Sequence, residues 1–360
     1  MTSLTGEHRA RAIWSHLCEP GDPARSLVGS GAEDALTALR SGDLSGYAPY
    51  ADRWRTRLEG LPPDVEDGIQ PGTFLIPTDP GWPRRLDDLG DMTPIGLWVD
   101  GDSSVLNRPA VSIVGSRAAT HYGTAVATEF ATALSSSHVL VSGGAYGIDA
   151  AVHRAALAAR GRTVVVAAGG IDRIYPAAHR ALVETIVVAG GAIVSEQPPG
   201  AAPARHRFLS RNRLIAALGQ ATVVVEAARR SGALSTARWA GELGREVCAV
   251  PGPITSHASS GTNQLLRDFG TCVTSPGDLL ELLGTIGPDP ILPEHATSYD
   301  RLHERDKKVW NALETSRIRS LPALAREAGL SVSETVSSLE LLRSIGMARS
   351  IAGRWFRVIV

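Results

Sequence analysis

Between residues 109 and 250 the chain alternates short apolar runs with segments of helical pattern, and this alternation limits its fold more than any other feature. The apolar runs are Val111–Val114, Val139–Val141, Thr163–Ala167, Ala192–Ser195, Thr222–Val225 and Glu246–Val250. Strands that are apolar throughout and alternate with helices are typical of a parallel sheet covered on both faces. The sequence therefore predicts an α/β fold with a Rossmann-like, mostly parallel sheet as its core.

The flanking segments follow other patterns, so we expect several domains in the 360 residues. The last segment predicts two helices, a turn at Gly329, a third helix and two short strands around Gly353, which is the plan of a winged helix. The predicted parts are a helical domain of the SAM or helix-hairpin kind (1–65), the Rossmann-like domain (70–285), a linker rich in Pro, Gly and Thr (286–304) and a winged-helix-like domain (305–360).

Charge is distributed unevenly, although the formal net charge is only −1. Residues 1–110 carry 10 Arg against 17 Asp and Glu, a net charge of −7. Residues 201–245 carry 8 Arg against 2 Glu, a net charge of +6, and residues 305–360 carry 10 Lys and Arg against 5 Asp and Glu, a net charge of +5. Two basic segments in a nearly neutral chain indicate two places where a polyanion can dock.

Several functional classes lack their signatures. The cysteines Cys18, Cys248 and Cys272 are not spaced as metal ligands and fit a reducing compartment. No long apolar stretch or secretion signal is present, and neither a Walker Gly-x-x-x-x-Gly-Lys-Ser/Thr loop nor a Gly-x-Ser-x-Gly elbow occurs. We therefore expect a cytoplasmic protein with no membrane contact, no cofactor, no metal site and no catalytic residue.

A turn that starts with glycine, Gly115-Ser116-Arg117, follows the first strand where a helix should begin. Backbone N–H groups at such a position bind anions. Gly115 permits close approach, Ser116 can bond an oxygen, and Arg117 can bind a phosphate through two nitrogens. The full Gly-x-Gly-x-x-Gly spacing of a dinucleotide site is absent. The turn therefore indicates a binding site for a phosphate group, without showing which ligand carries that phosphate. The alternative is a plain turn whose arginine is solvated.

Other strand ends carry similar residues, namely Ser142, Gly143 and Gly144 after the second strand, Arg173 after the third, and Ser231 and Gly232 after the fifth. Because the carboxyl ends of parallel strands meet at one edge of a sheet, we expect these turns to face the first one. A plain helix cap is the alternative for Ser231 and Gly232. Tyr175, two residues after Arg173, fits the start of a helix better than a ligand contact.

The densest basic run is Arg-His-Arg-Phe-Leu-Ser-Arg-Asn-Arg over residues 205–213. Arg207 and Arg211 share a helical face because they are four residues apart, whereas Arg213 points elsewhere. Phe208 is interleaved and Asn212 is a further polar candidate. Arginine beside an aromatic ring suits a nucleic-acid backbone with a base stacked next to it. Basic residues at a helix start oppose the helix dipole, which favours a bound anion over a merely solvated helix start with Phe208 in the core.

Together these motifs resemble the DNA-processing protein A (DprA/Smf) family over roughly residues 70–285. The runs that carry the resemblance are Ile-Val-Gly-Ser-Arg (113–117), Val-Ser-Gly-Gly-Ala-Tyr-Gly-Ile-Asp (141–149), Gly-Gly-Ile-Asp-Arg-Ile-Tyr-Pro (169–176), Arg-Asn-Arg-Leu-Ile-Ala-Ala-Leu (211–218) and Ser-Gly-Ala-Leu-Ser-Thr-Ala (231–237). The resemblance implies binding of single-stranded DNA, loading of the recombinase RecA during natural transformation, and a homodimer formed through the Rossmann-like domain.

The resemblance also implies roles for particular residues. The family's phosphate-binding arginine falls on Arg117, and its Arg-Asn-Arg run supplies Arg211 and Arg213. The helix after Tyr-Pro commonly starts Pro-x-x-Asn in the family, and His179 stands in the place of that asparagine here.

Two other functions stay open. An enzyme of the LOG phosphoribohydrolase type has a related fold, but its Pro-Gly-Gly-x-Gly-Thr-x-x-Glu run is here split between Val250–Pro253 and Gly261–Thr262, without the glutamate. A transcription regulator would rest on residues 305–360 alone. The candidate recognition helix there, Ser333–Ile345, has Arg343 as its one basic residue, so a protein-interaction or packing module fits that segment better.

Overall fold

The computed structural model describes residues 5–29, 31–62, 65, 73–284, 298–299, 301–315 and 318–358. The chain divides into two compact units, Met1–Gly287 and Pro288–Val360. Most of the predicted linker, 286–297 and 300, lies outside the described residues.

A nine-stranded sheet in the order β1-β2-β6-β5-β4-β3-β7-β8-β9 forms the centre of the first unit. The strands β3 to β9 are parallel to one another, whereas β1 pairs antiparallel with β2 and β2 pairs antiparallel with β6. The predicted α/β class and mostly parallel core are thereby confirmed. The strands are Phe74–Leu75 (β1), Leu97–Gly101 (β2), Ala110–Val114 (β3), Val139–Ser142 (β4), Thr163–Val166 (β5), Ala192–Ser195 (β6), Ala221–Val224 (β7), Glu246–Ala249 (β8) and Thr271–Cys272 (β9).

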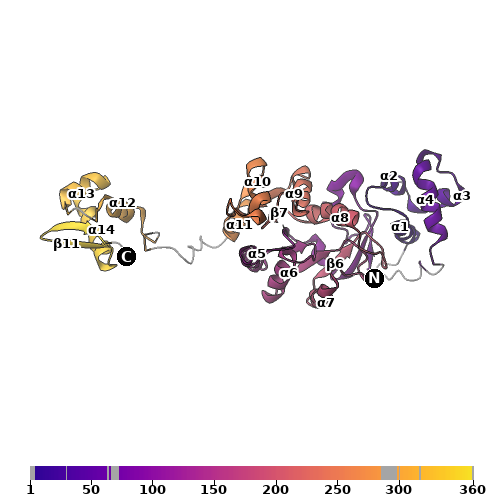
Figure 1. Cartoon of the computed structure of the whole chain (residues 1–360), viewed down its shortest axis with the longest axis horizontal. Coiled ribbons are helices and arrows are strands. Elements are labelled where there is room, and N and C mark those ends of the chain that lie inside the picture. The colour runs from indigo at the N-terminus through magenta and orange to yellow at the C-terminus, as the bar shows by residue number, and fades with distance from the viewer. Residues whose placement is uncertain are drawn as a thin grey trace. The chain divides into compact units, whose positions relative to one another are not determined.

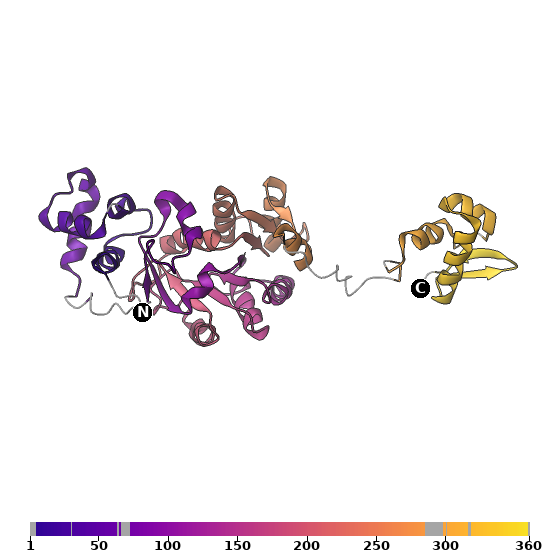
Figure 2. The ribbon, with the colours of Figure 1, turned by 180° about the vertical axis from the view of Figure 1, so that it is seen from behind.

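Helices cover both faces of the sheet, as Figures 1 and 2 show. On one face the side chains of Val111 and Ile113 join the apolar cluster of α5 and α6, and on the other Ala110 and Val114 join that of α8 and α9. This double burial is why the strands β3 to β7 contain no charged residue. The helices after β3 are His121–Leu134 (α5), Ile148–Ala158 (α6), Arg180–Val188 (α7), Arg205–Leu218 (α8), Ala233–Glu242 (α9), Ser260–Asp268 (α10) and Pro276–Leu282 (α11).

The order of the strands reverses between β3 and β7. From β3 the chain continues to β4, β5 and β6 on one side, and α8 then returns it across the sheet to β7, β8 and β9 on the other. At such a switch point the loops after the two central strands diverge and leave a crevice at the carboxyl ends of the strands. The fold therefore places its natural ligand site between the loops that follow β3 and β7.

Within the residues described before the sheet, four α-helices form part of the first compact unit. Their own core contains Trp14 and Trp54, whose rings meet edge to face at 5.3 Å. Trp98 of β2 donates a hydrogen bond to the Ser15 hydroxyl at 3.1 Å, so the first helix is fastened to β2, the strand next to the edge strand β1. The helices are Gly6–Leu17 (α1), Ala24–Gly29 (α2), Ala32–Ser41 (α3) and Ala48–Glu59 (α4).

The second unit has the order of a winged helix, which confirms that prediction. Gly329 ends α13 with φ +66° and Gly353 turns the hairpin with φ +72°, both as glycine permits. Ser331 and Glu334 form a capping box at the start of α14. The elements are Glu304–Ala312 (α12), Arg319–Ser320 (β10), Leu321–Ala328 (α13), Val332–Ser344 (α14), Ala348–Ile351 (β11) and Arg354–Arg357 (β12). Across the described ranges of both units, no helix is long and apolar enough to cross a bilayer.

Candidate nucleic-acid interface

A cleft with a volume of about 840 Å³ opens at the switch point of the sheet. Most of its lining comes from three segments, namely the turn after β3, the loop after β7 and α8, and Ala145, Asp149 and His257 complete it. Of the residues predicted from the sequence, the cleft brings together Gly115, Ser116, Arg117, Phe208, Arg211, Asn212, Ser231 and Gly232.

The turn after β3 is held in place by close backbone contacts. A Cβ added to Gly115 would lie 2.6 Å from a side-chain carbon of Ile148 and 3.0 Å from the carbonyl oxygen of Glu226. The amide of Ser116 donates to that same carbonyl at 2.7 Å, and its carbonyl accepts from Ile148 N at 3.1 Å. Only glycine fits at position 115, and these contacts hold the backbone that leads through Ser116 to Arg117.

Arg117 is an exposed cation beside an aromatic ring. Its guanidinium carbon lies 4.9 Å from the centre of the Phe208 ring. Among the described residues it makes no ion pair, so its charge is available to a ligand. The contact with Phe208 restricts the motion of the long side chain without neutralising it.

Arg211 forms the floor of the cleft and is only 5% exposed. Its Nη1 donates to the carbonyl oxygen of Gly143 at 2.9 Å and to that of Val166, and so ties together the loops after β4 and β5. A Cβ on Gly143 would lie 2.6 Å from Nη2 of Arg211, which explains the glycine. Arg211 therefore braces the cleft in addition to lining it.

Asp149 at the start of α6 is the acidic neighbour of Arg211. Burial lowers the pKa of Arg211 to about 10, while the charge of Asp149 opposes that shift. Burial likewise raises the pKa of the Asp149 carboxyl, and Arg211 opposes that shift in turn. Each group thus compensates part of the other's cost of burial.

The predicted residues Ser142, Gly143 and Gly144 at the end of β4 are buried. The Ser142 hydroxyl donates to the carbonyl oxygen of Ile113 at 2.7 Å inside the sheet and does not reach the cleft. Gly144 has φ +69°, and its carbonyl oxygen accepts a hydrogen bond from His179 Nδ1 at 2.9 Å. His179 therefore makes a polar contact at the position where the resemblance implied an asparagine.

Arg213 does not face the cleft, which corrects its assignment as a DNA contact. Its side chain is 2% exposed, and its two Nη atoms donate to the carboxylate of Glu196 at 2.6 and 2.5 Å. Its Nε donates to the carbonyl oxygen of Met92 at 2.9 Å. Arg213 is two residues after Arg211 on the same helix, so its side chain points to another side. There it stabilises the fold.

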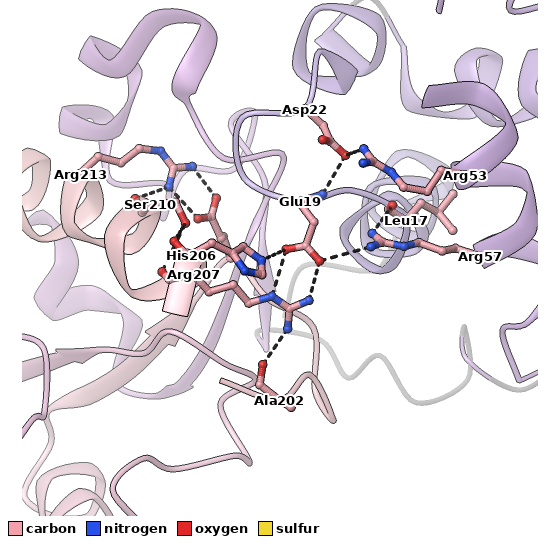
Figure 3. A network of polar contacts seen from close by, with 11 residues as sticks. Leu17, Glu19, Asp22, Arg53, Arg57, Ala202, His206, Arg207, Ser210 and Arg213 are labelled. Carbon is pink, nitrogen blue, oxygen red and sulfur yellow. Dashed lines mark hydrogen bonds and ion pairs between the residues drawn. The ribbon is translucent and has the colours of Figure 1, made fainter. Parts of the chain in front are cut away.

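Arg207 is also committed to another part of the protein (Figure 3). Its Nε and Nη2 donate to the carboxylate of Glu19, in the turn after α1, at 3.0 and 2.6 Å. His206 and Arg57 contact the same carboxylate at 3.3 and 3.4 Å. Burial alone would raise the pKa of Glu19, but these basic neighbours outweigh it and lower that pKa. Arg207 thus fastens α8 to the N-terminal helices and does not line the cleft.

The remaining predicted residues connect the walls of the cleft or lie beside it. Asn212 Nδ2 donates to the carbonyl oxygen of Gly232 at 3.2 Å, so α8 is tied to the loop after β7. The Ser231 hydroxyl accepts from Ala233 N at 3.3 Å, the contact of a helix cap. Arg173 lines a smaller neighbouring pocket together with Gly143 and Gly144.

Two arginines missed by the sequence reasoning, Arg229 and Arg230, also line the cleft, as does His257. Both arginines are exposed, and no ion pair is formed by either within the described ranges. They directly precede Ser231 and lie in the segment of net charge +6, so their position was readable from the sequence. The available charges at the cleft are therefore Arg117, Arg229 and Arg230.

The residues relevant to a LOG-type enzyme do not reach the cleft. Asn263 bonds the backbone of Gly252 through both side-chain atoms, at 2.9 and 3.2 Å. Gly261 N donates to the carbonyl oxygen of Ala227 at 2.7 Å. These groups connect neighbouring loops, and none of them lines the cleft.

The fold and the cleft define a Rossmann-like α/β protein with an arginine-rimmed site at its switch point. Residues 73–284 match the family model described as DNA recombination-mediator protein A. A relative from Mycobacterium tuberculosis is 39% identical over 369 residues, which cover 96% of this chain and 94% of the relative. The chain therefore belongs to the DprA/Smf family of DNA recombination-mediator proteins.

Solved structures agree with this assignment. The X-ray structure of DNA processing protein A from Streptococcus pneumoniae has a TM-score of 0.67 and 30% identity, covering 78% of this chain and 98% of that chain. The structure of the Helicobacter pylori protein, reported for its single-stranded DNA binding mode, has a TM-score of 0.53 and 29% identity, covering 58% of this chain and 95% of that chain.

The buried pair gives a stability prediction. Arg213→Ala leaves the carboxylate of Glu196 without its partner in a site that is 11% exposed on the Glu196 side. Removal of one partner from a buried ion pair costs about 3–5 kcal/mol. We expect a clear fall in the urea midpoint of the full chain, whereas Arg173→Ala, at an exposed arginine, leaves it unchanged. Equal midpoints for the two variants would contradict the structural role of Arg213.

Proposed function

We propose that this protein binds single-stranded DNA in the cleft and helps to load RecA onto it, without making or breaking bonds in the DNA. The observation that carries the proposal is that Arg117, Arg229 and Arg230 line one cleft together with Phe208, whose ring Arg117 contacts. Exposed arginines bind phosphates, and an aromatic ring offers a face to an unpaired base. The reported DNA-binding mode of the Helicobacter pylori relative supports this use of the fold.

Such a site is expected to bind DNA of any sequence. Its cations reach phosphates, which carry no sequence information, and an aromatic face accepts every base. This tolerance suits a cytoplasmic protein that receives DNA taken up in natural transformation.

The RecA step is tested by the rate of RecA ATP hydrolysis on single strands already coated with single-strand-binding protein. Addition of this protein should shorten the lag, and an unchanged lag would remove that part of the proposal.

The Arg117→Ala variant tests the site. Loss of one phosphate contact should weaken binding to all single-stranded sequences alike and reduce the slope of log K against log salt by about 0.7. Fluorescence anisotropy at several salt concentrations measures both quantities. Arg154→Ala on α6 removes an exposed arginine outside the cleft and is the matched control. Unchanged affinity in the Arg117 variant would exclude this cleft as the binding site.

Arg207 gives the opposite prediction, because its guanidinium is already bound by Glu19. Arg207→Ala should leave the single-strand affinity and its salt slope close to those of the wild type. It should instead loosen the N-terminal helices, which limited proteolysis detects as faster cleavage within residues 5–62. A loss of affinity as large as that of Arg117→Ala would show that DNA displaces Glu19 from Arg207.

The proposed homodimer has a candidate surface at β9, the last strand in the sheet order. Both residues of β9 are exposed, and the Phe269 side chain beside it is 52% exposed. The edge of a sheet that is not covered offers backbone groups to a second copy.

Cys272 in β9 makes this surface testable. If two copies pair through β9, a short bismaleimide should link their Cys272 thiols into a covalent dimer, seen on a denaturing gel. Cys18 and Cys248 are buried, and burial raises the pKa of the Cys248 thiol to about 12, so they should not react. Cys272→Ser is the control. A dimer by light scattering without any cross-link would place the interface elsewhere.

A further inference from the structure

We propose that Tyr175 is a second base-stacking residue. The DNA strand would leave the cleft, pass over Phe208 and continue along Tyr175 in the loop after β5. The inference deepens the proposed function and rests on it. It states which parts of the ligand bind beyond the cleft. Unpaired bases would stack on an aromatic surface, and their phosphates would lie next to Arg173.

The aromatic contacts run in succession from the cleft. The Arg117 guanidinium lies 4.9 Å from the ring centre of Phe208. The ring of Tyr175 meets Phe208 edge to face, with centres 5.4 Å apart and an angle of 67° between the planes. Phe208 therefore belongs both to the cleft and to a second surface, which continues its apolar face outward.

Tyr175 is not a buried packing residue. Its side chain is 53% exposed, and its hydroxyl has no hydrogen-bond partner within the part of the chain that is described. The pocket beneath Tyr175 and Phe208 has a volume of about 10 Å³, which is no more than one water molecule requires. A base cannot enter below the rings, so a ligand has to lie against their outer faces.

Arg173 supplies a charge beside this surface. Its side chain is 61% exposed, and its ion pair with the neighbouring Asp172 joins Nε and Oδ2 at 3.6 Å. Pairs between exposed groups at such distances contribute little, so Arg173 can turn to a phosphate. Asp172 is already engaged, because its Oδ1 accepts from the amide of Gly200 at 2.8 Å.

The surface selects single strands for a physical reason. A base stacked on a protein ring has to leave its neighbours, which unpaired bases do at much lower cost than paired ones. Every base has an aromatic face, so the contact tolerates any sequence. Phosphate contacts alone would bind both kinds of DNA, and Tyr175 adds the preference for single strands.

The test compares Tyr175→Ala, Tyr175→Leu and Tyr175→Phe in the full chain by anisotropy, with an oligo(dT), an abasic oligonucleotide of the same length and a duplex. The alanine and leucine variants should lose about fivefold or more in oligo(dT) affinity. The phenylalanine variant should match the wild type, because it keeps the ring. The abasic strand and the duplex should bind all four proteins equally. The salt slope should stay unchanged, because no phosphate contact is lost.

Three outcomes are distinguishable. Equal oligo(dT) affinity in the wild type and Tyr175→Ala, with weak binding by Arg117→Ala, would overturn the stacking role and leave the proposed function intact. Failure of the wild type to bind oligo(dT) would overturn both. Losses on the abasic strand as large as those on oligo(dT) would show that Tyr175 acts through the loop structure and not through bases. The leucine variant, of similar bulk, keeps the test valid if the alanine variant unfolds.

Discussion

The site depends on one buried cation, Arg211. Its guanidinium bridges the carbonyl oxygens of Gly143 and Val166 and lies beside Asp149, so it connects the ends of β4 and β5 to α8. A charge buried in this way is stable only while its partners remain in place, and removal of one partner typically costs several kcal/mol. Arg211 therefore fixes the first half of α8 over the sheet, and the position of Phe208 at the mouth of the cleft follows from it.

The arginines of α8 show that burial decides which positive charges stabilise the fold and which remain available to a ligand. Arg207 is bound to Glu19, Arg211 to two carbonyl groups, and Arg213 to Glu196. Their charges are used to hold α8 against the N-terminal helices, the sheet and the loop after β6. Arginines on short loops, such as Arg117, make no such contacts among the described residues and keep their charge for a ligand. A basic sequence run is thus a poor guide to which of its cations can reach DNA.

Much of the fold could be predicted, because the parallel strands are buried on both faces and leave continuous apolar runs in the sequence. The β9 strand was missed, since its two exposed residues carry no such pattern. At the site, turns between strand and helix were predictable because they need glycine. The partners of Arg207 and Arg213 were not, because Glu19 and Glu196 lie 188 and 17 residues away and only packing brings them together. Helical spacing shows which residues share a face of a helix, but it does not show which face packs against the rest of the protein.

In the second unit, too, a basic sequence segment does not show which cations can reach DNA. Its side chains argue against the alternative of a transcription regulator. A base-reading helix needs side chains that donate or accept in the major groove and cations that hold the backbone. The exposed side of α14 has Ser333, Ser337 and Glu340, and its one basic residue, Arg343, pairs with Glu340 at 2.5 Å. The net charge of +5 in residues 305–360 therefore does not lie on the helix that would read DNA. A winged-helix fold specifies where a recognition helix stands, but the one basic residue of α14 is already paired, so this helix lacks an unpaired cation that would hold it to the DNA backbone.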